Sequence, residues 1–112
     1  MTQYWVTILR PDDYDPSVED AAMRRGISAL NEEMIAAGVR VFVGGLQSPQ
    51  RARSLSPQPD GQILVTDGPS LSTGRHVGGF WVLEVADLEA ALAWGRKAAV
   101  ACRAQVEVRP FH

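Results

Sequence analysis

The chain has little of what several large classes of protein require. Its single cysteine, Cys102, excludes an internal disulfide framework and indicates a reducing compartment. Its apolar runs fall far short of the ~20 residues that a membrane-spanning helix needs, and its first residues lack the features of a signal peptide. Lysine and arginine are scattered and the formal net charge is −2, so no basic stripe is available to bind nucleic acid. We therefore expect a cytoplasmic domain that binds neither membrane nor nucleic acid.

Motifs for metal, phosphate or nucleophilic chemistry are also missing. Two histidines and one cysteine, widely separated, match no spacing of metal ligands, so we expect no metal. The serines near residue 70 lie in no G-x-S-x-G elbow, which argues against a hydrolase of that kind. Gly78-Gly79 belongs to no phosphate-binding loop.

What is present is a strand–helix–strand pattern that occurs twice in a chain of 112 residues, the length of one domain. In the first unit, strands at 4–9 and 39–46 flank a helix that we expect Ser17 to cap and Gly38 to end. The apolar residues of that helix recur at helical spacing: Met23, Ile27, Leu30 and Met34.

The second unit has strands at 79–85 and 105–110 around a helix capped by Asp87. The residues of this helix expected to face inward are Leu88, Ala91, Leu92 and Ala98 or Ala99. Between the units, an Asp-Gly turn joins strands at 51–56 and 62–66 into a hairpin. This order predicts an α+β, ferredoxin-like split β-α-β repeat with an inserted β-hairpin, as a single domain over residues 1–112.

The strands of this sheet are apolar on both faces. In the first strand, Tyr4, Val6 and Ile8 alternate with Trp5, Thr7 and Leu9, and the strand at 80 alternates in the same way. Because two helices cover only one face of the sheet, large apolar side chains on the other face would remain exposed to water. A second copy of the same sheet is the simplest cover, so we expect a homodimer.

A set of short motifs, in order along nearly the whole chain, resembles the DGPF-motif branch of the YCII-related family. The motifs are Asn31-Glu32-Glu33, Ala37-Gly38-Val39, Leu46-Gln47, Val65-Thr66-Asp67-Gly68-Pro69, Gly78-Gly79-Phe80, Glu84-Val85, Asp87-Leu88 with Ala91, and Val106-Glu107-Val108-Arg109-Pro110. The resemblance implies a dimeric α+β barrel with a small pocket in each subunit. In the related YCII branch a His–Asp pair is associated with acid–base chemistry, but this sequence has no histidine before His76, so a histidine in the N-terminal half is not carried over. In this sequence Ser70 replaces the phenylalanine of the motif, and Ser72-Thr73-Gly74-Arg75 replaces a run of acidic and basic residues.

The loop from Asp67 to His76 therefore holds the candidate catalytic residues. His76 is suited to acid–base work near neutral pH, and Asp67 is the candidate base or orienting carboxylate. A turn role for Asp67 and a solvated position for His76 are the alternatives. Candidates for substrate binding are Arg75, whose guanidinium can clamp an anion, the loop hydroxyl of Ser70, the aromatic Trp81, and Arg109, which we expect to be partly buried beside a carboxylate.

On these grounds the leading hypothesis is a cofactor-independent enzyme of lyase, isomerase or cyclase type. It would transfer a proton on a small organic substrate, anionic if Arg75 binds it. The alternative is a non-catalytic dimeric module that binds a small ligand or serves in regulation.

Overall fold

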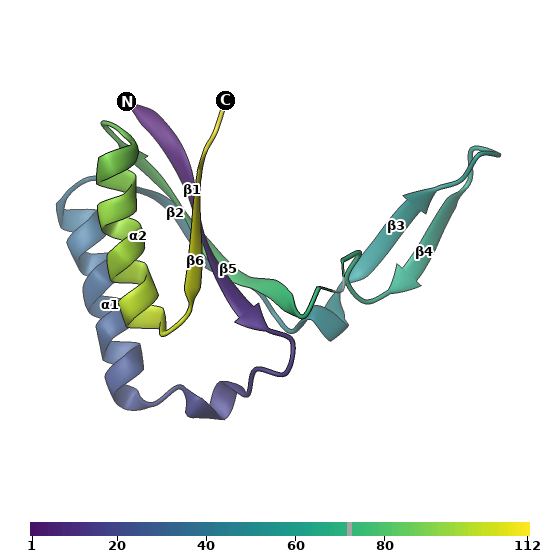
Figure 1. The fold of residues 1–112 in the computed structure, drawn as a ribbon, viewed down its shortest axis with the longest axis horizontal. Helices are drawn as coiled ribbons and strands as arrows, with labels where there is room; N and C mark the ends of the chain where they lie inside the picture. Colours follow the sequence, from purple (N-terminus) through teal and green to yellow (C-terminus); the bar gives the residue numbers. More distant parts are fainter. Residues whose placement is uncertain (72) are drawn as a thin grey trace.

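The computed structural model describes residues 1–71 and 73–112 and has one main sheet, one layer of helices and a projecting hairpin (Figure 1). The antiparallel sheet has the order β2-β5-β1-β6 and is formed by β1 (Thr2–Pro11), β2 (Arg40–Gly45), β5 (Arg75–Val85) and β6 (Gln105–Pro110). The helices α1 (Ala21–Ala36) and α2 (Leu88–Cys102) cover one face of it. The hairpin of β3 (Arg53–Pro57) and β4 (Ile63–Asp67) forms its own small sheet. This arrangement confirms the predicted α+β, ferredoxin-like fold with an inserted hairpin.

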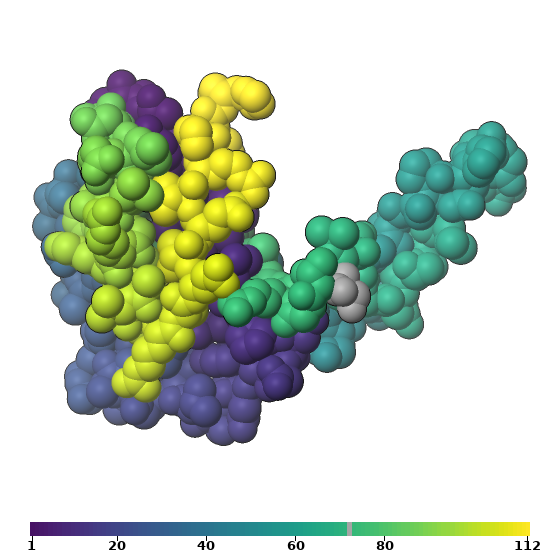
Figure 2. All heavy atoms as spheres, in the orientation of Figure 1, coloured from purple at the N-terminus to yellow at the C-terminus, as the bar shows by residue number. Residues whose placement is uncertain are grey.

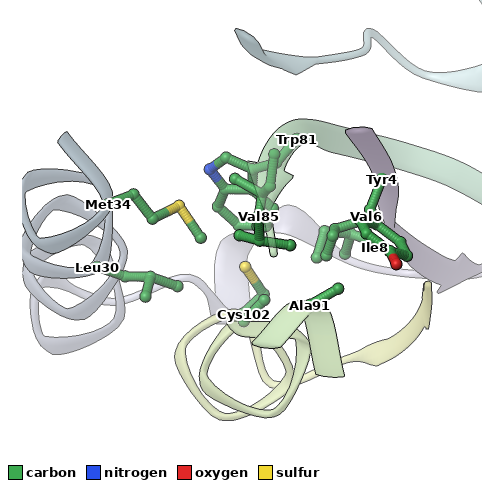
Figure 3. Close-up of a cluster of buried hydrophobic side chains, with 11 residues drawn as sticks. Tyr4, Val6, Ile8, Leu30, Met34, Trp81, Val85, Ala91 and Cys102 are labelled. Atoms are coloured by element: carbon green, nitrogen blue, oxygen red, sulfur yellow. The ribbon is translucent and has the colours of Figure 1, made fainter. Parts of the chain in front are cut away.

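The hydrophobic core lies between the helices and one face of the sheet. The register places Tyr4 opposite Leu83 and Val6 opposite Trp81, so these side chains point to the same side. The buried cluster comprises Tyr4, Val6, Ile8, Leu30, Met34, Trp81, Leu83, Val85, Ala91, Ala98 and Cys102 (Figure 3). The alternation predicted for β1 and β5 is therefore confirmed on this face.

The opposite face of the sheet, which we call the open face, carries aromatic side chains. Trp5 of β1 stacks on Phe80 of β5 with ring centroids 4.2 Å apart. Phe42 of β2 adjoins the same ring at 5.7 Å and is itself 54% exposed. The predicted second apolar face is thus present, and its cover by another copy stays a prediction.

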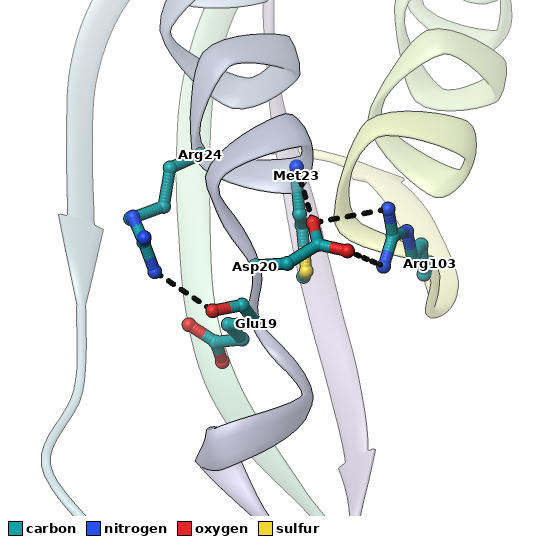
Figure 4. Close-up of polar contacts among 5 residues, drawn as sticks. All are labelled: Glu19, Asp20, Met23, Arg24 and Arg103. Atoms are coloured by element: carbon teal, nitrogen blue, oxygen red, sulfur yellow. Dashed lines mark hydrogen bonds and ion pairs between the residues drawn. The ribbon is translucent and has the colours of Figure 1, made fainter.

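Helix α1 begins later than the sequence indicated. Ser17 lies in a short 3-10 helix, Pro16–Val18, in which Asp15 accepts a hydrogen bond from the Ser17 N–H. The cap of α1 is Asp20, whose Oδ1 accepts the Met23 N–H at 2.8 Å; this bond lowers the pKa of Asp20 because it stabilises the charged form (Figure 4). The prediction of Ser17 was wrong because its turn was already closed by Asp15 and Pro16.

Asp20 also connects the two helices. The Arg103 guanidinium, one residue beyond α2, reaches the Asp20 carboxylate with an Nη2–Oδ1 distance of 3.3 Å (Figure 4). On the other side of the same turn, Arg24 donates to the backbone carbonyl of Glu19 at 2.7 Å. These contacts fix the segment that leads from β1 into α1.

The other helix boundaries follow the predictions with small differences. Gly38 has a φ of 72°, as its predicted role at the end of α1 requires, and Asp87 caps α2 by accepting the Ala90 N–H. Leu88, expected to face inward, is 47% exposed because it is the first residue of α2 and precedes the covered stripe. None of the helices in the described part of the chain is long and apolar enough to cross a membrane.

Two helical glycines offer a matched test of packing. A Cβ at Gly95 of α2 would lie 2.8 Å from Cγ2 of Val108 in β6, whereas a Cβ at Gly26 of α1 would meet nothing within 4 Å. Gly95→Ala is expected to lower the free energy of unfolding by about 1–3 kcal/mol through overpacking. Gly26→Ala is expected to raise it by about 0.5–1 kcal/mol, the gain in helix propensity. Urea unfolding measures both, and equal stabilisation by the two variants would contradict the close approach of α2 to β6.

Candidate functional site

A cavity of about 610 Å³ lies where β1 ends and β5 begins. One wall is formed by the end of β1 and its connection to α1, and another by residues 43–50, which lead from β2 toward the hairpin. Ile27 and Cys102 contribute from the helices. The volume falls in the range of sites for small organic molecules.

His76 and Asp12 form a pair in the wall of this cavity. The register of β1 and β5 places Arg10 opposite His76, and the Asp12 N–H donates to the Gly74 carbonyl at 2.9 Å. The two side chains consequently meet, with His76 Nδ1 3.0 Å from Asp12 Oδ1. Because a carboxylate only accepts, Nδ1 carries the proton in this contact, and in the neutral ring Nε2 is then the nitrogen with the lone pair. This is the arrangement of a histidine base with an orienting carboxylate.

A second polar pair lines the same cavity. Tyr14 donates its hydroxyl proton to Glu19 Oε2 at 2.7 Å. Burial, followed by this hydrogen bond, raises the pKa of Tyr14, so its hydroxyl stays protonated at neutral pH. The Arg10 guanidinium lies 4.3 Å from the centre of the Tyr14 ring and donates to the Cys102 carbonyl at 2.8 Å. The cavity thus contains the Arg10 cation and two acid–base pairs, His76–Asp12 and Tyr14–Glu19, the second of which includes a protonated phenol.

Cys102 does not add a nucleophile to the site. Burial is the main cause that raises the pKa of its thiol, so the thiolate is disfavoured. Within residues 1–71 and 73–112, histidine, cysteine and acidic side chains form no cluster of three that would hold a metal ion.

Two glycines of β5 shape the cavity. A Cβ at Gly78 would lie 2.9 Å from Cγ of Arg10, and one at Gly79 would lie 2.9 Å from the carbonyl oxygen of Gly44. These positions need glycine because the Arg10 side chain and the β2 backbone approach so closely. The sequence-based start of this strand at Gly79 was wrong: β5 begins at Arg75 and includes both glycines.

Of the residues predicted from sequence, His76 and Trp81 line the cavity. Trp81 is 3% exposed, and its Nε1–H donates to Asn31 Oδ1 at 2.9 Å. Asp67 lies instead on β4, where its carboxylate is 3.1 Å from Arg53 Nε and its side chain is 90% exposed. The expected pairing of Asp67 with His76 is therefore corrected: the carboxylate that reaches His76 belongs to Asp12.

The other predicted binding residues lie outside the cavity lining. Arg75 is exposed and hydrogen-bonded to Gln105, because the register places it at the outer end of β5. Ser70 is exposed in the connection between β4 and β5. Arg109 pairs with Glu107 as a carboxylate partner was expected, but its side chain is 70% exposed in the single chain. The predicted burial of Arg109 is wrong for the single chain. Val106 and Val108 lie on the core side of β6, so Arg109 lies on the open face.

Comparison with known families confirms the broader resemblance. The YCII-related domain matches residues 4–112, which include both helices, every residue of the cavity wall and all of the sheet except the first two residues of β1. No protein of curated function matches the chain. Because this match covers nearly the whole chain, the chain belongs to the YCII-related domain family.

Proposed function

We propose that this chain is a cofactor-independent enzyme that transfers a proton on a small organic substrate. The observation that carries the proposal is the 3.0 Å contact between His76 and Asp12 in the wall of a cavity of about 610 Å³. With Nδ1–H directed at Asp12, Nε2 of His76 is the base that takes a proton from the substrate. The Asp12 carboxylate then stabilises the imidazolium that forms.

The rest of the cavity supplies the functions that such a reaction needs. Tyr14, kept protonated, is a hydrogen-bond donor for an oxygen on which negative charge develops, once the substrate competes with Glu19. Arg10 provides the positive charge for an acidic group of the substrate, the role first given to Arg75. Trp81, Ile8 and Ile27 offer apolar surface for its carbon skeleton. Lyase, isomerase and cyclase reactions of substrates with an acidic C–H or O–H group can begin with this kind of proton abstraction.

The chain is placed in the DGPF-motif branch and in a homodimer as part of the same proposal. The branch is supported by Val65–Pro69 with Gly78-Gly79-Phe80, and by the role of these glycines at the cavity. The dimer is supported by the open face, where Trp5, Phe42 and Phe80 form an aromatic cluster. A cytoplasmic location fits the single reduced cysteine.

The test follows the exchange of a substrate proton for deuterium from the solvent. The purified protein is incubated in D₂O with a metabolite extract, and mass spectrometry identifies compounds that gain one deuterium at carbon. We expect at least one small acid or phenol to exchange only in the presence of protein, with Asp67→Asn as an active control because Asp67 lies on the exposed hairpin. Compounds that bind, by saturation-transfer NMR, without any exchange or conversion would contradict catalysis and favour a ligand-binding module.

A further inference from the structure

The hairpin of residues 53–67, which we call the arm, presents an apolar face to solvent. The register pairs Leu55 with Val65 and Pro57 with Ile63, so these four side chains share one face. Leu55 is 65% exposed, Ile63 53% and Val65 58%. The charged residues lie at the ends of the arm, where Arg53 pairs with Asp67 at the root and Asp60 is in the turn. The middle of the arm is therefore built to meet an apolar surface.

The arm extends from the side of the sheet that the helices leave uncovered. In Figure 1 the helices lie on one side of the main sheet and β3 and β4 reach out on the other. Figure 2 shows open space between the arm and the body of the molecule. The arm and the open face, with Trp5, Phe42 and Phe80, thus border the same space.

The surface of the chain is larger than that of a compact monomer of the same mass. It exposes 7499 Å². A compact monomer of 12.2 kDa should expose about 6,100 Å². The Cα radius of gyration is 16.2 Å, against about 13 Å for a compact domain of this length. The excess of about 1,400 Å² exceeds the roughly 800 Å² that each partner buries in an ordinary stable interface. An isolated two-stranded hairpin is also marginally stable in water, so an arm with these side chains needs a cover.

We propose that the arm clasps a second copy of this chain, which would cover the apolar face formed by Leu55, Ile63 and Val65. This rests on the homodimer given above and assigns the arm as a second, separate contact of it. A twofold interface uses the same patch on both copies, and the aromatic open face is a surface that can pack against itself. The second copy would occupy the space beside the arm and cover Leu55, Ile63 and Val65. The uncharged middle of the arm fits such an apolar neighbour and does not fit a charged partner.

The clasp also has a consequence for the cavity. Residues 46–50 connect β2 to the root of the arm and form part of the cavity wall. Leu46 is tied to β5 by its N–H bond to the Gly78 carbonyl at 2.9 Å. If the second copy holds the arm, residues 46–50 are fixed at both ends, by β5 at Leu46 and by the arm after residue 50.

The experiment measures association separately from catalysis. Sedimentation equilibrium gives the dimer dissociation constant for the full chain, for Leu55→Ser/Val65→Ser, and for the control Ser56→Ala/Thr66→Ala on the other face of the arm. The apolar-face pair is expected to raise the dissociation constant by about 100-fold or more, because two anchors of the interface are lost. The control pair is expected to change it less than about threefold. Circular dichroism should show the same helix content in all three, since the arm lies outside the core.

Three results would overturn the clasp. These are a monomeric full chain, a dimer that both pairs of substitutions leave equally strong, and a monomer whose arm binds a foreign protein. A second variant, with residues 53–67 replaced by a short glycine–serine linker, guards against local rescue by repacking and should dimerise no more tightly than Leu55→Ser/Val65→Ser. Absence of deuterium exchange in the unsubstituted protein would refute catalysis but leave these masses unchanged, so catalysis and the clasp fail separately.

Discussion

Replacing His76 by glutamine is expected to lower kcat/KM for the exchanging substrate by about 10²- to 10⁴-fold, the usual contribution of a positioned general base. Glutamine preserves a polar side chain of similar reach but has no nitrogen that takes up a proton at neutral pH. The melting temperature should change little, because His76 lies at the start of β5 and outside the buried cluster. The measurement is the rate of deuterium exchange beside a thermal unfolding curve.

Variants of Asp12 and Asp67 test which carboxylate orients His76. Asp12→Asn should lower the exchange rate, because a neutral amide does not stabilise the imidazolium, while its oxygen can still accept the Nδ1–H. Asp67→Asn should leave the exchange rate within about twofold of that of the unsubstituted protein, as is usual for a surface substitution. The reverse order would contradict the assignment of Asp12 and restore the pair suggested by the motif.

The strand and helix faces were predictable because each depends on local periodicity. Alternation in β1 and β5 places Tyr4 and Leu83 on one side, and the helical spacing of Met23, Leu30 and Met34 places them on another buried stripe. These patterns need no knowledge of distant contacts. They predicted the core, the layer of helices and the second apolar face of the sheet.

The partner of His76 was not predicted because it depends on register. The sequence-based strand began only at Gly79, which left Arg75 and His76 in a loop beside Asp67. In the structure the glycines lie inside β5, so His76 pairs with Arg10 at the end of β1, and Asp12 follows within reach. The signal was available: in a ferredoxin-like sheet the first and third core strands are antiparallel neighbours, and the residues after the first meet the start of the third.

Tyr14, Glu19 and Arg10 were missed for a related reason. Tyr14 and Glu19 lie in the connection between β1 and α1, which was interpreted only as a turn and a cap. Their meeting depends on the 3-10 helix that Asp15 caps and on the cap of α1 at Asp20, which the sequence-based choice of Ser17 as the cap did not include. The apolar arm poses the opposite problem: its pattern was visible, but a pattern does not show which surface covers it.

Trp81→Ala is expected to lower the free energy of unfolding by about 3–5 kcal/mol, the range for large aromatic truncations in cores. The indole is 3% exposed, lies opposite Val6 of β1, and belongs to the central buried cluster. It also lines the cavity, so its loss enlarges the substrate space at the same time as it removes core contacts. Chemical denaturation measures the loss of stability, and KM for the exchanging substrate should rise with it.

Trp81→Phe separates the two contributions of the indole. Phenylalanine keeps most of the apolar contact but loses the Nε1–H bond to Asn31, which is worth about 1 kcal/mol. Asn31 remains fixed, because its Oδ1 also accepts from Arg40 at 3.2 Å and its Nδ2 donates to the Ile27 carbonyl at 3.0 Å. A loss of about 1–2 kcal/mol for phenylalanine beside the larger loss for alanine would assign most of the effect to packing. Equal losses for the two variants would show instead that the hydrogen bond to α1 holds this side of the core and the cavity in place.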